Sequence, residues 1–562
     1  MNLKRPTVSP LWLAGAASIW IATLANLPLW RELQSLGLLN TIPDGLFALA
    51  LATIISCVLT AILSLLAWRW TLKPAIFILL AMSAAAAYFM WTYHIVIDSD
   101  MVVNMLQTDV KEAGALWNSR LLGTIFLLAV VPAIGVAKVR VARAPLLRQC
   151  LRNFGTASAA IALIATTVLV AFQPFASTMR NHKQLRYLMN PLNTVYALGY
   201  VASKPLRQGK SVLEGIGADA VAPAPGERPP LLVLVIGETA RSANFSLNGY
   251  ARTTNPELAR EDIASFRNAV SCGTSTAASL PCMFSSLGRE RYNARPHDYE
   301  NLLDVLHRSG LAVMWIDNQS GCKGVCDRVP SASTAELTDS ELCHKGECLD
   351  AIMLKGLDER LAELPQDRRK RGVVLVMHQM GSHGPAYYQR SPAGAKTFGP
   401  ECTSNNLQEC TSSELINAYD NSIVYTDQVL GSLISWLKSQ QTKFDPAMVY
   451  VSDHGESLGE NNLYLHGLPY GIAPDNQKRI PWITWLSPAF AQRAAIDFSC
   501  VKKRKDIAVS HDNYFHSVLG LLQVRTKIYE GAQDVYAPCV SQAEMASRFD
   551  SLAVSSRDAV ER

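Results

Sequence analysis

Five long stretches without a charged residue fill the first 180 positions and limit the fold more than any other feature. Each is about long enough to cross a hydrocarbon core of ~30 Å as a helix rising ~1.5 Å per residue. Their number and spacing exclude the buried helices of a soluble domain, and they continue well past a cleaved signal peptide. The sequence therefore predicts five transmembrane helices: Leu11–Trp30, Leu46–Trp68, Pro74–Ile97, Leu121–Ala137 and Asn153–Met179.

The loops between these helices carry opposite charge patterns. The basic ends contain Lys4, Arg5, Arg69, Lys73, Lys138, Arg140, Arg143, Arg148 and Arg152, whereas the other loops contain mainly Glu32, Asp44, Asp98, Asp100, Asp109 and Glu112. Because basic loops stay cytoplasmic, we expect a cytoplasmic N-terminus and, after five crossings, the remainder of the chain on the far side. Much of the net charge of +5 then reflects topology, and no nucleic-acid partner is expected.

The region after the last helix changes composition twice. Residues Ser177–Lys210 are basic and amphipathic, which fits either an interfacial helix or a solvated linker helix. A tether rich in Pro and Gly follows at Gly215–Pro230. We therefore expect a transmembrane domain at 1–180, a linker with an interfacial amphipathic segment at 181–230, a catalytic domain at 231–545 and a C-terminal tail at 546–562.

The 12 cysteines are unevenly distributed along the chain. Only Cys57 and Cys150 precede the tether, and the rest follow it at short spacings: Cys272, Cys282, Cys322, Cys326, Cys343, Cys348, Cys402, Cys410, Cys500 and Cys539. This pattern predicts a disulfide framework in an oxidising compartment, since the repeated Cys-x-x-Cys pairs of a thiolate zinc site are missing from the sequence. Connectivity does not follow from the spacing, and pairing of sequence neighbours is a hypothesis.

Strand and helix patterns alternate through the second half of the chain. Strands are expected at 231–236, 266–270, 311–316, from Val373, from Ala447 and at 482–486, and helices at 301–308, 350–362, 412–438 and 513–522. This alternation favours a mostly parallel sheet covered by helices on both faces.

Three of these strands end in residues that are typical of metal sites. Glu238 follows the first, His378 and then His383 follow the strand at Val373, and Asp453 with His454 follows the strand at Ala447. Because ligands bind beyond the carboxyl ends of parallel strands, we expect these side chains at one edge of the sheet. Carboxylate and imidazole together suit zinc, which also accepts a hydroxyl oxygen.

A nucleophile for such a site is available in the segment Ser271–Cys282, which follows a predicted strand. A helix beginning near Thr276 would be capped by the preceding residue and would favour a phosphate at its N-terminus. An alcohol becomes a good nucleophile when a metal or base lowers its pKa. Spacing alone does not separate Thr274, Ser275, Thr276 and Ser279, and any of them also fits a capping role in a turn.

The strand-end motifs and the hydroxyl segment together resemble the lipid A phosphoethanolamine transferases. The motifs that carry the resemblance are Gly237–Arg241, Cys272–Ala277 with Pro281–Phe284, His378–Pro385 and Ser452–Ser457. That family includes the mobile colistin-resistance proteins, and its catalytic domain belongs to the alkaline phosphatase and sulfatase superfamily. The resemblance covers essentially the whole chain and implies five transmembrane helices followed by an α/β sulfatase-like domain.

Carried over residue by residue, the resemblance implies the following site. One tightly bound zinc ion is held by Glu238, Thr276, Asp453 and His454, with Thr276 as the nucleophile. His383 and His466 match positions around the transferred phosphate or a second zinc, and Lys323 and Glu456 match positions lining that pocket. The ten clustered cysteines match the disulfides of the family, whereas a structural role is expected for His378.

The implied reaction is a double displacement at phosphorus in the bacterial inner membrane, with the catalytic domain in the periplasm. Thr276 takes phosphoethanolamine from phosphatidylethanolamine, and a lipid A phosphate then takes it from Thr276. Both substrates lie among membrane lipids, and a monomer is favoured. Resistance to cationic peptides such as polymyxin is the expected consequence of modifying lipid A.

Three alternatives compete with this interpretation. The same donor chemistry could serve a core sugar or another periplasmic glycan. A sulfatase is disfavoured because residues 272–276 lack the Cys/Ser-x-Pro-x-Arg setting that those enzymes use. A non-catalytic membrane scaffold would be marked by loss of a metal ligand, and each ligand position is filled in this sequence.

Overall fold

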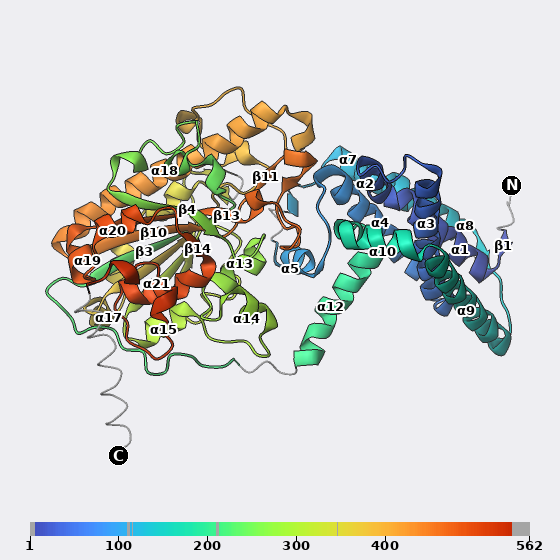
Figure 1. Cartoon of the computed structure of the whole chain (residues 1–562), viewed down its shortest axis with the longest axis horizontal. Helices are drawn as coiled ribbons and strands as arrows, with labels where there is room; N and C mark the ends of the chain where they lie inside the picture. Colours follow the sequence, from blue (N-terminus) through green and yellow to red (C-terminus); the bar gives the residue numbers. More distant parts are fainter. Residues whose placement is uncertain are drawn as a thin grey trace, which may run out of the picture. The chain divides into compact units, whose positions relative to one another are not determined.

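The computed structural model describes residues 6–108, 113–114, 116–208, 213–335, 337–344 and 347–541. Two compact units make up the chain, one from residues 1–102 with 116–204 and one from 103–115 with 205–562. Figure 1 shows a mainly helical first unit, whose only described strands are the short pair β1 (Thr7–Val8) and β2 (Arg140–Val141), and a second unit built around a sheet. The expected tail at 546–562 lies outside the described residues, and the four-part division made from the sequence stays a prediction.

Five helices of the first unit are long and apolar enough to cross a membrane, as expected. The first combines α1 (Pro10–Thr23), η1 (Leu24–Asn26) and α2 (Leu27–Ser35). Next come α3 (Ile42–Leu65) and α4 (Leu72–Tyr93). The fourth combines α7 (Ser119–Ile125), the π-helical η2 (Phe126–Val130) and α8 (Val131–Lys138), and the fifth is α9 (Leu146–Val170).

The fifth span was placed too far along the chain. Helix α9 begins at Leu146 and ends at Val170, and a separate helix, α10 (Phe172–Asn181), follows. The break has a local cause, because Pro174 has no N–H to donate to the carbonyl of residue 170 and so cannot continue that helix.

The basic segment after α9 forms three separate helices instead of one. They are α10, α11 (Gln184–Tyr187) and α12 (Leu192–Gln208). The turn before α12 is anchored within the first unit, where Nδ2 of buried Asn26 donates to the carbonyl of Asn190 at 2.6 Å and the Asn190 N–H donates back to Oδ1 of Asn26 at 2.9 Å. The far end of the expected segment, at Lys210, lies outside the described residues.

The second unit is organised around one eight-stranded sheet with the order β14-β4-β13-β10-β3-β9-β5-β6. The strands are β3 (Pro230–Gly237), β4 (Ile263–Val270), β5 (Ala312–Asp317), β6 (Ser331–Ser333), β9 (Val373–His378), β10 (Asp445–Ser452), β13 (Arg479–Leu486) and β14 (Ala508–Ser510). Only β13 runs antiparallel to its neighbours among the described pairings, so the mostly parallel sheet is confirmed.

Helices cover both faces of this sheet, as Figure 1 shows. Alternate residues of β3 enter two separate hydrophobic clusters, with Leu232, Leu234 and Ile236 in one and Leu231, Val233 and Val235 in the other. The first cluster is closed by α13 (Thr276–Met283), α15 (Leu302–Arg308) and α21 (Tyr514–Leu521), and the second by α16 (Leu357–Glu363) and the long α18 (Ser412–Ser439). Burial on two sides explains why the strand sequence is continuously apolar.

One expected helix is divided in the structure. The stretch 350–362 forms a 3-10 helix, η6 (Asp350–Leu354), followed by α16, which begins after Gly356. Gly356 has a φ of +71°, a left-handed conformation that interrupts a helix and that glycine adopts without steric cost. The helical periodicity of the sequence ran across this break.

Ten cysteines of the second unit form five disulfides between sequence neighbours. The pairs are Cys272–Cys282, Cys322–Cys326, Cys343–Cys348, Cys402–Cys410 and Cys500–Cys539. The remaining two cysteines, Cys57 and Cys150, are free. Short disulfide loops of this kind stabilise a domain by about 2–3 kcal/mol each and mainly restrain local segments.

Peptide mapping under non-reducing conditions should recover these five pairs from the purified full-length protein. Free thiols are expected only at Cys57 and Cys150, because the other ten are paired in the fold. Alkylation before and after reduction, read by mass spectrometry, measures both quantities. If most cysteines of the second unit were alkylated without reduction, the pairing and the oxidising compartment would both be wrong.

A candidate metal centre at the ends of three strands

Three neighbouring strands bring the expected metal ligands to one edge of the sheet. Strand β3 lies between β10 and β9, with Gly237 opposite Ser452 of β10 and Ile236 opposite His378 of β9. Glu238 and Asp453 therefore leave the sheet at the same level. The prediction that the three strand ends converge is confirmed by this register.

Glu238, Asp453 and His454 form a buried cluster whose ligand atoms all lie within 4.8 Å of one another. Nε2 of His454 lies 3.5 Å from Oε1 of Glu238 and 3.3 Å from Oδ2 of Asp453. The backbone N–H groups of Thr239 and His454 donate to Oδ1 of Asp453 at 3.1 and 2.7 Å. These bonds orient the carboxylate so that its other oxygen faces the cluster.

Thr276 joins this cluster at the first residue of α13. Its Oγ1 donates to the Glu238 carboxylate, with 3.1 Å to each oxygen, and lies 3.4 Å from Nε2 of His454. The helix begins where the sequence predicted, although within the described residues the side chain of Ser275 makes no capping hydrogen bond at its N-terminus. The four side chains that the family resemblance groups together thus lie in contact.

The protonation state of His454 tests whether a cation fits here. Its Nδ1 lies 2.9 Å from the carbonyl of Gly455, which can only accept, so Nδ1 carries the hydrogen and Nε2 presents a lone pair. Burial lowers the pKa of His454 to about 4, and the ring is therefore neutral at physiological pH. Oδ2 of Asp453 is buried without a hydrogen bond among the described residues. Two lone-pair donors facing each other at 3.3 Å fit a shared metal ion, and the donor set suits zinc.

A second group of polar side chains lies beside the cluster. The ring of His466 has its centroid 4.4 Å from that of His454 and 5.7 Å from that of His383. Nδ1 of His466 lies 3.4 Å from Oε2 of the fully buried Glu456. Burial raises the pKa of Glu456 to about 8, so this carboxyl holds a proton at neutral pH. Three of the four expected substrate-binding residues are thereby brought together.

Lys323, the fourth, belongs to the loop that follows β5. Its Nζ donates to the carbonyl and the hydroxyl of Ser320 at 3.1 and 2.9 Å, and its backbone is left-handed with a φ of +50°. The described contacts link this loop to the cluster through Gln319, whose Nε2 donates to Oε2 of Glu238 at 3.2 Å. The loop therefore reaches the site, although the described bonds of Lys323 Nζ go to Ser320 and, at 3.2 Å, to the carbonyl of Gln107, and not to the cluster.

Sequence reasoning missed several residues that shape the site. Gln319 and Asp317 come from the end of β5, and Asp317 holds Nδ1 of the buried His378 at 2.8 Å. Tyr387 donates its hydroxyl to Oε2 of Glu456 at 3.0 Å. The strand-end rule would have pointed to Asp317 and Gln319, because β5 ends at the same edge as β9. Nothing in the local sequence marks Tyr387.

The hydroxyls that spacing left open have different partners in the structure. Thr274 donates to the carbonyl of Leu468 at 2.6 Å, and Ser279 donates to the carbonyl of Asp453 at 2.5 Å. Thr276 instead contacts Glu238 and His454. Geometry therefore favours Thr276 over Thr274 and Ser279 as the hydroxyl that serves the cluster.

Comparison with known proteins was consistent along the whole chain. A family model described as "Sulfatase" matches residues 230–524, and one described as "Phosphoethanolamine transferase EptA/EptB" matches residues 55–206. The chain is 39% identical to phosphoethanolamine transferase EptA of Salmonella typhimurium over 96% of its own length and 98% of that protein. It is also 39% identical to phosphatidylethanolamine transferase Mcr-1 of Escherichia coli, covering 86% and 90% of the two chains.

A solved structure agrees with these matches. The integral membrane protein lipooligosaccharide phosphoethanolamine transferase A of Neisseria meningitidis superposes with a TM-score of 0.90 at 35% identity, covering 95% of this chain and 99% of that one. Identity above 30% over nearly the full length of several relatives extends to both units of the fold. The chain therefore belongs to the phosphoethanolamine transferases, enzymes that combine a helical membrane unit with a sulfatase-like α/β domain.

Proposed function

We propose that this enzyme transfers phosphoethanolamine from phosphatidylethanolamine to a phosphate of lipid A through a covalent intermediate on Thr276. The observation that carries the proposal is the contact of the Thr276 hydroxyl with both Glu238 and His454. The donor is taken from the name of Mcr-1, a phosphatidylethanolamine transferase, and the class of acceptor from the lipooligosaccharide transferase of Neisseria meningitidis.

Glu238, Thr276, Asp453 and His454 would hold one zinc ion in this proposal, and His383 with His466 would border a second if one binds. Zinc bound there would supply positive charge that lowers the pKa of a hydroxyl and neutralises phosphate oxygens. The chain's own contribution is orientation: the two backbone N–H groups on Asp453 and the Gly455 carbonyl on His454 fix both ligands before substrate arrives.

In the first half-reaction, Oγ1 of Thr276 forms a bond to the donor phosphorus and the bond to the diacylglycerol oxygen breaks. Diacylglycerol leaves with a proton, and phosphoethanolamine remains on Thr276. In the second half-reaction, an oxygen of the lipid A phosphate attacks the same phosphorus and restores the threonine. The backbone N–H groups at the start of α13 favour the negative charge of the transferred group.

His383, His466, Lys323 and Glu456 would bind that transferred group. Glu456 is suited to this because Tyr387 donates to its Oε2, while its buried Oε1 has no hydrogen bond among the described residues. A carboxyl that keeps its proton at neutral pH can donate from Oε1 to a phosphate oxygen. His466, 3.4 Å from the same carboxyl, would lie on the side toward the metal ligands.

The proposal places the enzyme in the bacterial inner membrane as a monomer, with a cytoplasmic N-terminus and a periplasmic catalytic domain within 231–545. Five disulfides in the second unit and the basic charge of the alternate loops support this arrangement. Both substrates are lipids, which accounts for a membrane unit of five helices. Adding an ethanolamine cation to a lipid phosphate would weaken the attraction of polymyxin to the cell surface.

Mass spectrometry of lipid A from cells with and without the protein tests the acceptor. One added phosphoethanolamine on lipid A is expected only when the wild-type protein is present, with Thr276→Ala as the matched control. An addition confined to core sugar would overturn lipid A as the acceptor while leaving the donor chemistry intact. Unmodified lipopolysaccharide throughout would overturn the proposed activity toward this acceptor class.

A further inference from the structure

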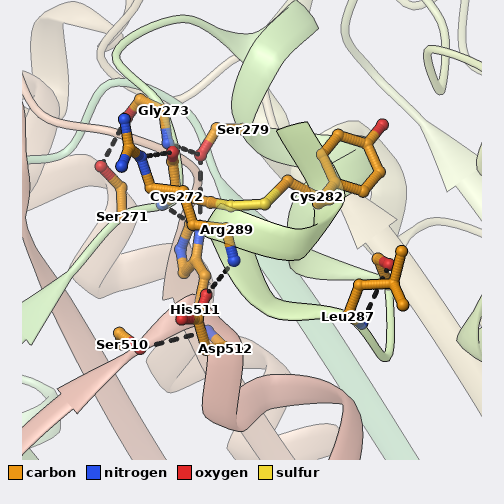
Figure 2. The surroundings of a disulfide bond; sticks show 12 residues. Ser271, Cys272, Gly273, Ser279, Cys282, Leu287, Arg289, Ser510, His511 and Asp512 are labelled. Atoms are coloured by element: carbon orange, nitrogen blue, oxygen red, sulfur yellow. Dashed lines mark hydrogen bonds between the residues drawn. A yellow bond between two sulfur atoms is a disulfide. The ribbon is translucent and has the colours of Figure 1, made fainter. Parts of the chain in front are cut away.

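His511 is a fully buried histidine that joins the loop before Thr276 to the strand end before Asp453. It begins the short helix η13 (His511–Asn513), between β14 and α21. Its Nδ1 accepts the N–H of Cys272 at 3.1 Å, and its Nε2 lies 2.9 Å from the carbonyl of Ser452. Figure 2 shows the imidazole next to Cys272, at one end of the Cys272–Cys282 disulfide.

The two partners determine how His511 is protonated. A carbonyl can only accept and a backbone N–H can only donate, so Nε2 carries the hydrogen and Nδ1 presents a lone pair. Burial lowers the pKa of His511 to about 4, which agrees with a neutral ring that uses both nitrogens. Replacing the ring with an apolar group would leave a buried N–H and a buried C=O without these partners.

Ser279 makes a second connection between the same two segments. Its hydroxyl donates to the carbonyl of Asp453 at 2.5 Å and accepts the N–H of Gly273 at 3.3 Å. It also lies 3.3 Å from Nδ1 of His511. Figure 2 shows Ser279 and His511 on the same side of Cys272. The Cys272–Cys282 disulfide ties the same loop to the end of α13. The loop that carries Thr276 is therefore held by His511 at Cys272, by Ser279 at Gly273 and by the disulfide to Cys282.

We propose that His511 is a positioning residue of the transfer reaction, which sets the location of Thr276 relative to Asp453 by hydrogen bonding Cys272 and Ser452. The inference rests on the proposed function, because it matters only if Thr276 is the nucleophile. His511 does not touch the transferred group. Its contribution is to hold the segment 272–276 in register with the end of β10, where a displacement of about 1 Å can cost on the order of 10²-fold in rate.

The effect should appear in kcat and not in KM when His511→Phe is assayed as full-length enzyme in detergent with phosphatidylethanolamine. We expect the rate of diacylglycerol release to fall about 10²-fold. KM for the donor and the zinc content should stay near wild-type values, because His511 contacts neither substrate nor metal. His511→Asn, whose side-chain oxygen can still accept the Cys272 N–H, should recover most of the rate.

His516→Phe is the matched control. His516 is equally buried and also bonds backbone groups, those of Glu530 and Ser286, but neither lies in the Thr276 loop or in β10. Its replacement should lower the melting temperature as much as His511→Phe does while leaving kcat within about 3-fold of wild type. An equal loss of kcat in both variants would show that His511 only stabilises the fold, and it would overturn the inference.

Hydrogen exchange supplies a readout that does not depend on activity. The amide of Cys272 should exchange faster in His511→Phe than in wild type, and His511→Asn should restore its protection. If His511→Phe does not accumulate, Ser279→Ala carries the test with a smaller change. That variant should lower kcat about 10-fold, and an unchanged rate would overturn the proposal.

The two proposals fail in different ways. A wild-type enzyme that forms no adduct on Thr276 would overturn the proposed nucleophile and the inference with it. A wild-type adduct that forms at the same rate in His511→Phe would overturn the inference alone. Slow adduct formation in His511→Phe with rescue by His511→Asn supports both.

Discussion

Replacing Thr276 with alanine should abolish release of diacylglycerol from phosphatidylethanolamine, and transfer to any acceptor with it. The hydroxyl is the oxygen that contacts both Glu238 and His454, so its removal takes away the attacking atom and one proposed zinc ligand together. Loss of a nucleophile typically lowers kcat by roughly 10⁴–10⁶-fold. Diacylglycerol release in detergent, measured without acceptor, isolates this half-reaction.

Two neighbouring variants make this result specific. Thr276→Ser keeps an oxygen but loses the methyl group that restricts its rotamer, so partial activity is expected. Thr274→Ala removes a hydroxyl two residues away that donates to the carbonyl of Leu468, at 2.6 Å, and not to the cluster. It should therefore cost far less than Thr276→Ala.

Intact mass of the enzyme incubated with donor alone gives the direct readout. One added phosphoethanolamine is expected, and it should map to the peptide that contains Thr276. An adduct on Thr274, Ser275 or Ser279, or one that persists in Thr276→Ala, would show that the wrong hydroxyl had been assigned even if the reaction class survived.

The sheet and its active edge could be predicted because they follow from local pattern. Strand β3 is continuously apolar because both of its faces are buried. The residues that follow parallel strands lie at the same edge of the sheet. Those two facts are enough to group Glu238, Asp453 and His454 from the order of residues alone. The choice among four nearby hydroxyls could not be made this way, because it depends on where each oxygen points.

Residues that support the site were harder to foresee, since their roles depend on distant parts of the chain. His511 acts on Cys272, 239 positions away, and Tyr387 on Glu456, 69 positions away. Neither lies in a motif with a metal-ligand or nucleophile spacing. The misplaced fifth helix has a different origin, because the apolar sequence continues past Val170, whereas α9 ends at Val170 and Pro174 lies in the separate helix α10. A pattern of apolar residues does not show that a proline lacks the backbone N–H that a continuous helix needs.

Replacing Glu238 with alanine should remove bound zinc and transfer together, and His454→Ala should do the same. Nε2 of His454 lies 3.3 Å from Oδ2 of Asp453 and 3.5 Å from Oε1 of Glu238, and both replaced side chains are fully buried, so water cannot substitute for either ligand without repacking. Loss of a residue that merely supports a metal ligand costs about 10–100-fold, and loss of a ligand itself should exceed that. Metal content per chain, measured on the purified full-length enzyme, and diacylglycerol release are the two measurements.

Asp420→Asn is the control that separates loss of metal from loss of fold. Asp420 is another buried carboxylate of the same unit, but it pairs with Arg252, Asn244 and Tyr250 instead of the cluster. Its replacement should lower the melting temperature while leaving zinc content unchanged, whereas Glu238→Ala should keep its five disulfides and lose zinc. If zinc-depleted Glu238→Ala still released diacylglycerol at the wild-type rate, the metal assignment would be wrong. In the proposed chemistry the bound metal supplies the positive charge that activates Thr276, and Glu238, Asp453 and His454 supply none.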